Sequence, residues 1–333
     1  MIKRMHNYKG MATSLFYHIR WSRMGMIRNI TIYRLLNILH VFFEWKLGIS
    51  YAKSRPFVVR LEPSAICNLK CPTCVTPKRQ FAEGEVKRMD LESFRIIFNS
   101  ISKHLYRLTF YINGEPMLNT DLFKMIKIAS SKNIYTSFST NFTLMREAYL
   151  EPIFDSGLDW ISICLDGFSQ ETYSKYRVNG NVDSVKEGIK MLMEYKIANN
   201  YNKPIVNVFT ITFNHVKPEI EAIKSFCTEH KVDEHRLRPD NSNMDGSFNY
   251  QVIKRKYKKC FWPWLAIKID ADGSVYPCPC ATEKGIKYGN LKEQSLDEIW
   301  NNEFYIESRK YISGKTAMKE QLNLPCYNCH YFK

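Results

Sequence analysis

Three closely spaced cysteines constrain this chain more than any other feature of its sequence. Cys67, Cys71 and Cys74 follow one another with three and then two residues between them, and the next cysteine is Cys164. A [4Fe–4S] cluster normally takes four cysteine ligands, so a compact set of three predicts a cluster with one iron left free. A small molecule is expected to complete the coordination shell of that iron, so the iron is the expected reactive centre.

The composition predicts a globular protein with a large core. The chain has 333 residues, of which 45% are hydrophobic and 14% aromatic, so one large domain or a large and a small one can form. Nothing near the N-terminus has the pattern of a secretory signal. We therefore expect a cytoplasmic protein, in which the ten cysteines serve metal ligation rather than disulfides.

Positive charge is concentrated at the start of the chain. Residues 1–55 hold ten Lys or Arg and a single acidic residue, Glu44, within a chain of net charge +15. Apolar side chains recur there at near-helical spacing: Ile30, Leu35, Ile38, Val41, Phe42 and Trp45. Arg34, His40 and Glu44 interrupt the run, so it is a poor membrane span. The segment predicts a basic, partly amphipathic helical extension, which either lies on an anionic membrane surface as a peripheral contact or packs on the outside of the main domain.

Short apolar runs alternate with helical stretches from residue 56 onward. Six strands are predicted: Phe57–Leu61, Leu108–Ile112, Ile134–Phe138, Trp160–Leu165, Ile205–Thr212 and Arg236–Arg238. Capping boxes predict helix starts at Ser184 with Glu187 and at Ser295 with Glu298. The alternation indicates βα units and a parallel sheet, and six strands predict an α/β fold with a partial (β/α)6 barrel. Ligand sites of such barrels lie where the strands end, which is where the three cysteines follow the first strand.

Further motifs fall at the ends of successive predicted strands. These are Gly114-Glu115-Pro116 after the second, Thr140-Asn141 after the third and Leu165-Asp166-Gly167 after the fourth. With the three cysteines they resemble the radical S-adenosylmethionine (SAM) enzymes, in the group that carries a SPASM or Twitch C-terminal extension. The resemblance implies that SAM chelates the free iron and that a 5′-deoxyadenosyl radical abstracts a substrate hydrogen. It also implies that Glu115 and its neighbours hold the methionine part of SAM, and that Thr140, Asn141, Cys164 and Asp166 hold its ribose.

Two positions depart from the pattern of that family. Thr73 stands before the third cysteine, where many relatives carry an aromatic residue that lies against adenine. Cys164 stands where serine is usual. Three roles stay open for Cys164: a ribose neighbour, a hydrogen-atom donor to a substrate radical, or a small buried side chain, which is how a free cysteine commonly packs.

A second set of cysteines lies in the C-terminal third. Cys260, Cys278, Cys326 and Cys329 make four ligands, and Asp272-Gly273 predicts a hairpin that brings Cys260 toward Cys278. The arrangement resembles an auxiliary-cluster domain of the Twitch type, which implies one auxiliary [4Fe–4S] cluster. Cys280 is an alternative to Cys278, His330 is an alternative ligand beside Cys329, and a zinc site is the alternative to the cluster.

These features divide the chain into an extension (1–55), a partial barrel (56–245) and a small α+β auxiliary-cluster domain (246–333). The expected substrate is a small-molecule, sugar or lipid-linked metabolite, and the expected electron donor is a reductant such as flavodoxin or ferredoxin. The basic stretch 254–259 before Cys260 is either a phosphate contact or a solvated loop. Alternatives are a ribosomal-peptide maturase, an RNA-modifying enzyme and a non-catalytic iron–sulfur or zinc protein, although nucleic acid is not the expected partner.

Overall fold

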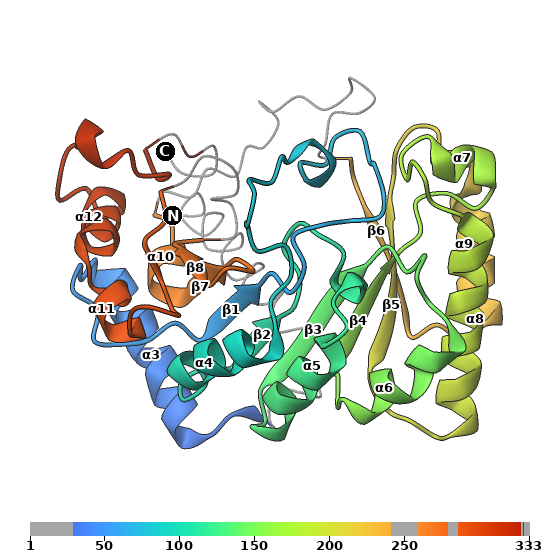
Figure 1. The fold of residues 1–333 in the computed structure, drawn as a ribbon, viewed down its shortest axis with the longest axis horizontal. Helices are drawn as coiled ribbons and strands as arrows, with labels where there is room; N and C mark the ends of the chain where they lie inside the picture. The colour runs from blue at the N-terminus through green and yellow to red at the C-terminus, as the bar shows by residue number, and fades with distance from the viewer. Residues whose placement is uncertain (1–28, 241–258, 279–285, 328, 330–333) are drawn as a thin grey trace, which may run out of the picture.

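One continuous mixed sheet organises the protein (Figure 1). The structure is a computed structural model that describes residues 29–240, 259–278, 286–327 and 329. The strands of these residues lie in the order β6-β5-β4-β3-β2-β1-β7-β8-β9. Their bounds are β1 Val58–Leu61, β2 Arg107–Thr109, β3 Tyr135–Thr140, β4 Trp160–Cys164, β5 Ile205–Ile211, β6 Glu234–Arg238, β7 Ala266–Ile269, β8 Ser274–Tyr276 and β9 Gly289–Asn290.

Strands β1 to β6 are the six that the sequence predicts, and each pairs in parallel with the next. Their apolar side chains form the core, and Val59, Leu108 and Ile161 are fully buried. Burial of these side chains is what strands covered by helices require. The expected partial barrel is therefore confirmed, and the carboxyl ends of its strands meet at one side of the molecule.

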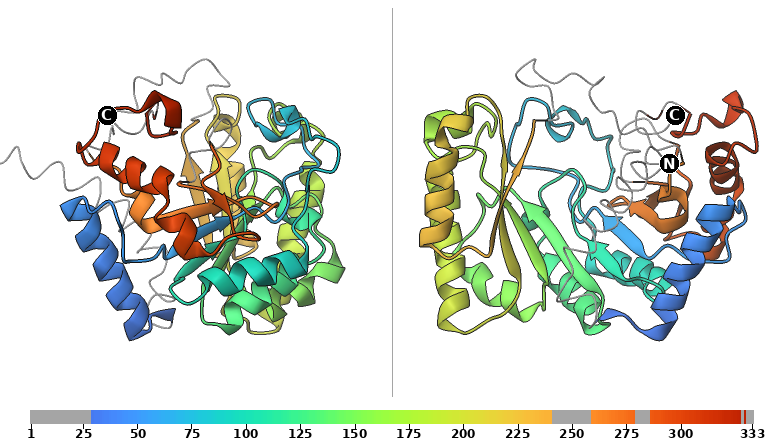
Figure 2. Two further views of the ribbon diagram at one scale, coloured as in Figure 1. Left: turned by 60° about the vertical axis from the view of Figure 1, so that its left-hand side comes forward. Right: turned by 180° about the vertical axis from the view of Figure 1, so that it is seen from behind.

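Helices follow the strands and cover the outer face of the sheet (Figure 2). They are α4 Leu91–Ile101, α5 Leu122–Ser131, α6 Leu150–Asp155, α7 Gln170–Ser174, α8 Val182–Ala198 and α9 Ile220–Glu229. The capping box predicted at Ser184 is wrong: α8 begins at Val182, and the N-cap is Asn181, whose side chain accepts from the backbone N–H of Ser184. Asn is as good an N-cap as Ser, so the helix begins three residues earlier.

The C-terminal part extends the same sheet. Strand β7 pairs in parallel with β1, and β8 and β9 continue antiparallel, so the predicted hairpin at Asp272-Gly273 is confirmed. The helices here are α10 Trp262–Leu265, α11 Leu296–Trp300 and α12 Glu303–Ile312. The capping box at Ser295 and Glu298 is also confirmed.

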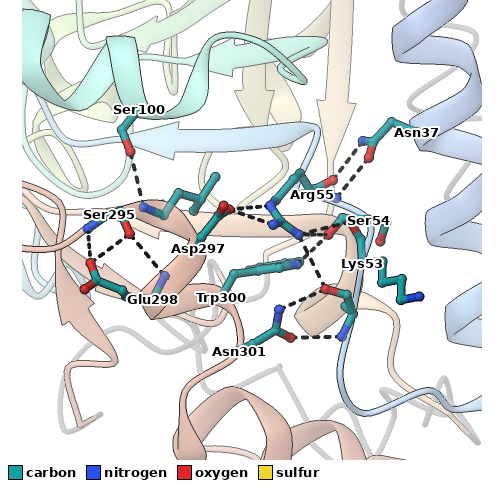
Figure 3. Close-up of polar contacts among 12 residues, drawn as sticks. Asn37, Lys53, Ser54, Arg55, Ser100, Ser295, Asp297, Glu298, Trp300 and Asn301 are labelled. Atoms are coloured by element: carbon teal, nitrogen blue, oxygen red, sulfur yellow. Dashed lines mark hydrogen bonds and ion pairs between the residues drawn. The ribbon is translucent and has the colours of Figure 1, made fainter.

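The predicted N-terminal helix is α3, Ile32–Leu47, and the segment after it is tied to the C-terminal part (Figure 3). Arg55 donates to Asp297 through Nε at 2.7 Å, and Trp300 Nε1 donates to the carbonyl of Ser54 at 2.8 Å. Asn301 exchanges two hydrogen bonds with the backbone of Ala52. Two regions at opposite ends of the sequence thus share one interface. Among the described helices, none combines the length and the hydropathy that a membrane span needs.

Candidate functional site

A cavity of about 640 Å³ runs along the strands of the partial barrel and reaches the loops at their carboxyl ends. Strands β1 to β6 and loops at their ends supply its wall, and α3 and α10 border it. The lining includes most of the sequence-predicted site residues of the barrel: Cys67, Cys71, Cys74, Gly114, Glu115, Thr140, Asn141 and Cys164. Pro116 and Asp166 are not part of the lining. The motifs that follow the first three strands therefore meet in one place, together with Cys164 at the end of β4.

Gly114 lets the loop after β2 pack directly on the loop that carries the cysteines. A Cβ at this position would lie 1.9 Å from the carbonyl oxygen of Ser64, which no side chain tolerates. The backbone N–H of Glu115 donates to the carbonyl of Ile66 at 2.8 Å. Close contact between the two backbones is the physical reason for glycine here.

Glu62, at the end of β1, is a buried residue that the sequence reading missed. Its Oε1 accepts from the backbone N–H groups of Asn113 and Gly114 at 3.0 and 2.9 Å. Burial raises its pKa to about 7, and the charge of Asp270 adds to the rise, although the two backbone donors and Lys268 oppose it. The available signal was a carboxylate placed directly after the apolar run Phe57–Leu61.

Glu115 joins the second and third strand ends. Its carboxylate accepts from Thr140 Oγ1 at 2.7 Å, from the backbone N–H of Asn141 at 2.8 Å and from that of Met117 at 3.1 Å. Burial raises the pKa of this carboxyl, while the three donors lower it. A carboxylate offers about four acceptor positions, so one remains for an incoming donor.

The first three thiols lie close together and interact with one another. Burial raises the pKa of Cys67 to about 11, and Glu115, Cys71 and Cys74 contribute to the rise. Asn141 Nδ2 lies 3.7 Å from the sulfur of Cys67, and Arg177 Nη1 lies 3.8 Å from that of Cys71. Negative charge on these sulfurs therefore has polar donors already in place.

The donor set fits an iron–sulfur cluster. Three thiols on one loop face the cavity, and thiolates are the ligands that such clusters take. Within the described residues no group of three or more His, Cys, Asp or Glu side chains is placed to hold a single metal ion.

Asp166 and Arg177 form a buried ion pair beside the cavity. Arg177 Nη2 and Nε contact Asp166 Oδ2 at 2.5 and 2.7 Å, and the backbone N–H of Ile211 donates to Asp166 Oδ1 at 2.6 Å. Burial would lower the pKa of Arg177, but Asp166 and the thiols of Cys164 and Cys71 raise it. Asp166 thus positions Arg177, a cavity residue that no sequence motif indicated.

Tyr176 provides an aromatic ring next to the position where Thr73 departs from the family pattern. Thr73 Oγ1 donates to the hydroxyl of Tyr176 at 3.4 Å, and Tyr176 lines the cavity. Its ring packs against Phe213 with centroids 4.5 Å apart. Cys164 also lines the cavity, 3.7 Å from Ser139 Oγ, and burial raises the pKa of its thiol.

The second set of cysteines is drawn from distant segments. Cys278 and Cys326 both lie near Tyr288 and Tyr305, since the two thiols contribute to the raised pKa of each phenol, after burial. Burial raises the pKa of Cys326 to about 12, and Cys329 adds to the rise. Cys260 lies two residues before α10, and its carbonyl accepts from Trp45 Nε1 at 3.1 Å. Cys280, His330 and residues 254–258 lie outside the described residues.

Comparison with known families identifies the class. The profile of the Radical SAM superfamily matches residues 61–227, and that of the SPASM iron–sulfur cluster-binding domain matches residues 260–330. The chain belongs to the radical SAM superfamily and is a radical SAM enzyme with a SPASM domain. Its cofactors are accordingly a [4Fe–4S] cluster with SAM and an auxiliary iron–sulfur cluster.

Individual relatives resemble parts or most of the chain. A probable GTP 3′,8-cyclase of Methanococcus maripaludis is 33% identical over 135 residues, which are 40% of this chain and 45% of that protein; the match thus spans less than half of that relative. The AdoMet-dependent heme synthase of Methanosarcina barkeri is 22% identical, with 84% of this chain and 89% of that protein covered. The structure of Streptococcus suis SuiB bound to S-adenosylmethionine has a TM-score of 0.63 and 17% identity, and the match covers 95% of this chain and 83% of that one.

Proposed function

We propose that this enzyme cleaves SAM reductively and uses the 5′-deoxyadenosyl radical to abstract a hydrogen atom from a small-molecule, sugar or lipid-linked metabolite. Cys67, Cys71 and Cys74 hold the cluster that binds SAM. When bound, that cluster supplies one electron, received from a reductant such as flavodoxin or ferredoxin, to the sulfonium. The observation that carries the proposal is the meeting of these three thiols with Glu115 in one cavity.

The residues of the chain bind and orient SAM. Glu115 accepts the methionine ammonium at its remaining acceptor position, because Thr140, Asn141 and Met117 already fix the carboxylate. Thr73 stands where many relatives carry an aromatic residue, and the nearby ring of Tyr176 packs on the nucleoside in its place. Apolar walls, including Phe138 and Phe209, exclude water from the radical.

The charges of the cavity favour an anionic substrate. Besides Arg177, which pairs with Asp166, three arginines line it, Arg60, Arg107 and Arg238, whereas Glu115 is its only lining carboxylate within the described residues. Guanidinium groups bind phosphate and carboxylate through two parallel hydrogen bonds. A phosphorylated or carboxylated metabolite, free or carried on a lipid, therefore fits the lining.

The second cysteine set is assigned the auxiliary cluster, with Cys260, Cys278, Cys326 and Cys329 as ligands. Four protein thiolates leave no iron free, so this cluster transfers electrons or braces the pocket and does not bind substrate. Electron transfer would make the reaction an oxidation, and a bracing role would leave the outcome open between oxidation and rearrangement.

Anaerobic reconstitution with SAM and dithionite tests the proposal. We expect wild-type protein to bind SAM and to form 5′-deoxyadenosine. The variant Glu115→Gln removes the charge that meets the ammonium, so its SAM affinity is expected to fall roughly 10-fold to 100-fold, as for the loss of a hydrogen bond between charged groups. Titration of SAM binding by calorimetry measures this directly.

Glu219→Gln is the matched control. Glu219 also accepts from several groups, including Phe168 N–H and Thr172 Oγ1, but it does not line the cavity. Its SAM affinity is expected to equal that of the wild type. Wild-type protein that neither binds SAM nor forms 5′-deoxyadenosine would refute the proposed function.

A further inference from the structure

Helix α3 presents an apolar face to solvent. Five side chains at helical spacing form a stripe that is 55–71% exposed: Ile32, Leu36, Leu39, Phe43 and Leu47. Tyr33, Leu35 and Phe42 widen this stripe and are 38–46% exposed. The opposite face is buried and mixed, with the apolar Val41 and Trp45 beside the polar Arg34, Asn37 and Glu44. The helix therefore carries apolar side chains on its exposed face as well as on its buried face, whereas an amphipathic surface helix usually keeps its exposed face polar.

Specific polar contacts hold the helix in this orientation. Arg34 donates to the carbonyls of Asn29, Asn133 and Lys132 at 2.6 to 3.0 Å. Asn37 exchanges two hydrogen bonds of 2.9 Å with the backbone of Arg55 (Figure 3).

Glu44 adds to this hold, because it accepts from the backbone N–H of Lys53 at 2.7 Å and from Ser54 Oγ at 2.5 Å. Rotation of α3 to bury its apolar stripe would break these contacts and strand their polar groups. The exposed face is thus built into the structure.

The charge around the stripe is positive. Lys103 lies over the ring of Tyr33 at 5.4 Å. Lys46, Lys259 and Lys315 gather at the C-terminal end of α3, where Lys259 donates to the carbonyl of Lys46 and Lys315 to that of Gly48. Glu44 is the one acidic residue of the helix, and it is buried. A partner for this surface must therefore accept both apolar side chains and positive charge.

We propose that α3 docks flat on an anionic lipid bilayer through this stripe. A helix of 16 residues is roughly 24 Å long, which suits a helix that lies in the interface. Tyr33 and Tyr51, near its two ends, are exposed, and tyrosine is favoured at the level of the lipid headgroups. A second copy of the chain fits less well, because it would bring the same lysines against one another.

The docked helix would connect the bilayer with the cavity. Leu35 and Phe42 are partly exposed beside the stripe and also line the cavity, together with Ile38 and Trp45. An acyl or prenyl chain can therefore follow apolar side chains from the membrane toward the arginine-lined wall. This access route rests on the proposed function, whereas docking itself does not.

Co-sedimentation with vesicles tests the docking. The full chain is expected to bind vesicles of phosphatidylglycerol and phosphatidylcholine, to bind pure phosphatidylcholine weakly, and to lose affinity as salt is raised. The double variant Leu36→Glu with Phe43→Glu should bind the anionic vesicles at least about tenfold more weakly. The control Ile96→Glu with Ile197→Glu adds the same charge at two side chains of α4 and α8 that are 47% and 46% exposed, and it should bind like the wild type.

Several results would overturn the proposal. The proposal is wrong if the wild-type protein stays in the supernatant. It is also wrong if the control variant loses as much vesicle binding as the α3 variant. If the wild-type protein does not bind vesicles but forms a dimer in light scattering, and the α3 variant is a monomer, the stripe is an interface with a second copy of the chain. Binding that emerges only after removal of residues 1–28 would assign it to that segment.

Thermal unfolding shows that each variant is folded, and SAM cleavage is measured in parallel. Vesicle binding by a wild-type protein that does not cleave SAM would refute the proposed function and leave the docking intact.

Discussion

The two cysteine sets of this protein are built in different ways. The first set lies on one loop, and its surroundings come from successive strand ends, with Gly114 packed on Ser64 and Glu115 bound to Thr140 and Asn141. The second set comes from three segments, and the region around it is held by contacts such as Trp45 with Cys260 and Arg309 with Ser50. The first site therefore follows from the barrel alone, while the second depends on how the two ends of the chain pack together.

The largest expected effects come from removing one thiol from each cysteine set, which tests whether the two sites are independent. Cys71→Ala should abolish 5′-deoxyadenosine formation, because the cluster that binds SAM loses one of three ligands. Cys326→Ala should leave SAM cleavage within about twofold of the wild type but abolish substrate turnover. Each variant should lower the iron content from about eight to about four atoms per chain, as measured on protein purified without oxygen.

Cys227→Ala is the control for those variants. Cys227 is a buried thiol of α9, and burial alone raises its pKa, so no other thiol influences it. Iron content and SAM cleavage should be unchanged. Loss of SAM cleavage in Cys326→Ala would instead show that the two sites fold as one unit.

The first site could be predicted from the sequence because its residues belong to short motifs that directly follow predicted strands. Cys67, Glu115 and Asn141 each follow a strand, and parallel strands bring their carboxyl ends together. Glu62 also follows a strand directly, but its role was missed because its partners are backbone groups of the loop after the next strand. Arg177 follows no strand end, and its role comes from its tertiary partners Asp166 and Cys71. Burial and pairing of this kind leave no periodic trace in a sequence.

The helix α3 shows a different limit. Its near-helical spacing of apolar residues predicted a helix, and the structure has one at Ile32–Leu47. The spacing did not predict which face would be buried. The buried face combines the apolar Val41 and Trp45 with three polar anchors, Arg34, Asn37 and Glu44. The anchors bond to Asn133, Arg55 and Ser54 and leave the other apolar side chains of the helix exposed.

A smaller effect concerns Glu62, which holds the backbone of Asn113 and Gly114 beside the first site. The pKa of Glu62 is raised to about 7 by burial, so its charged form destabilises the folded state. The free energy of unfolding should fall as the pH rises from about 4.5 to about 7, by roughly 3 kcal/mol at most. Glu62→Gln keeps an oxygen acceptor for Asn113 and Gly114 and should remove this part of the pH dependence.

Urea unfolding of both proteins between pH 5 and pH 8 measures the difference between the two curves. The variant should gain stability over the wild type as the pH rises, since only the wild type carries the buried charge. Parallel curves would show that Glu62 titrates as it does in the unfolded chain.

The smallest effect compares a helix start in each region. In the C-terminal part Ser295 caps α11, where its side chain accepts from the backbone N–H of Glu298 and the side chain of Glu298 accepts from Ser295. In the barrel Ser184 lies inside the first turn of α8, and Asn181 holds the cap. Ser295→Ala should therefore lower the free energy of unfolding by about 1 kcal/mol, whereas Ser184→Ala should change it by less than about 0.5 kcal/mol. Equal losses of stability in chemical denaturation would mean that Ser184 caps α8 in solution. The capping box predicted from the sequence would then hold at both helices.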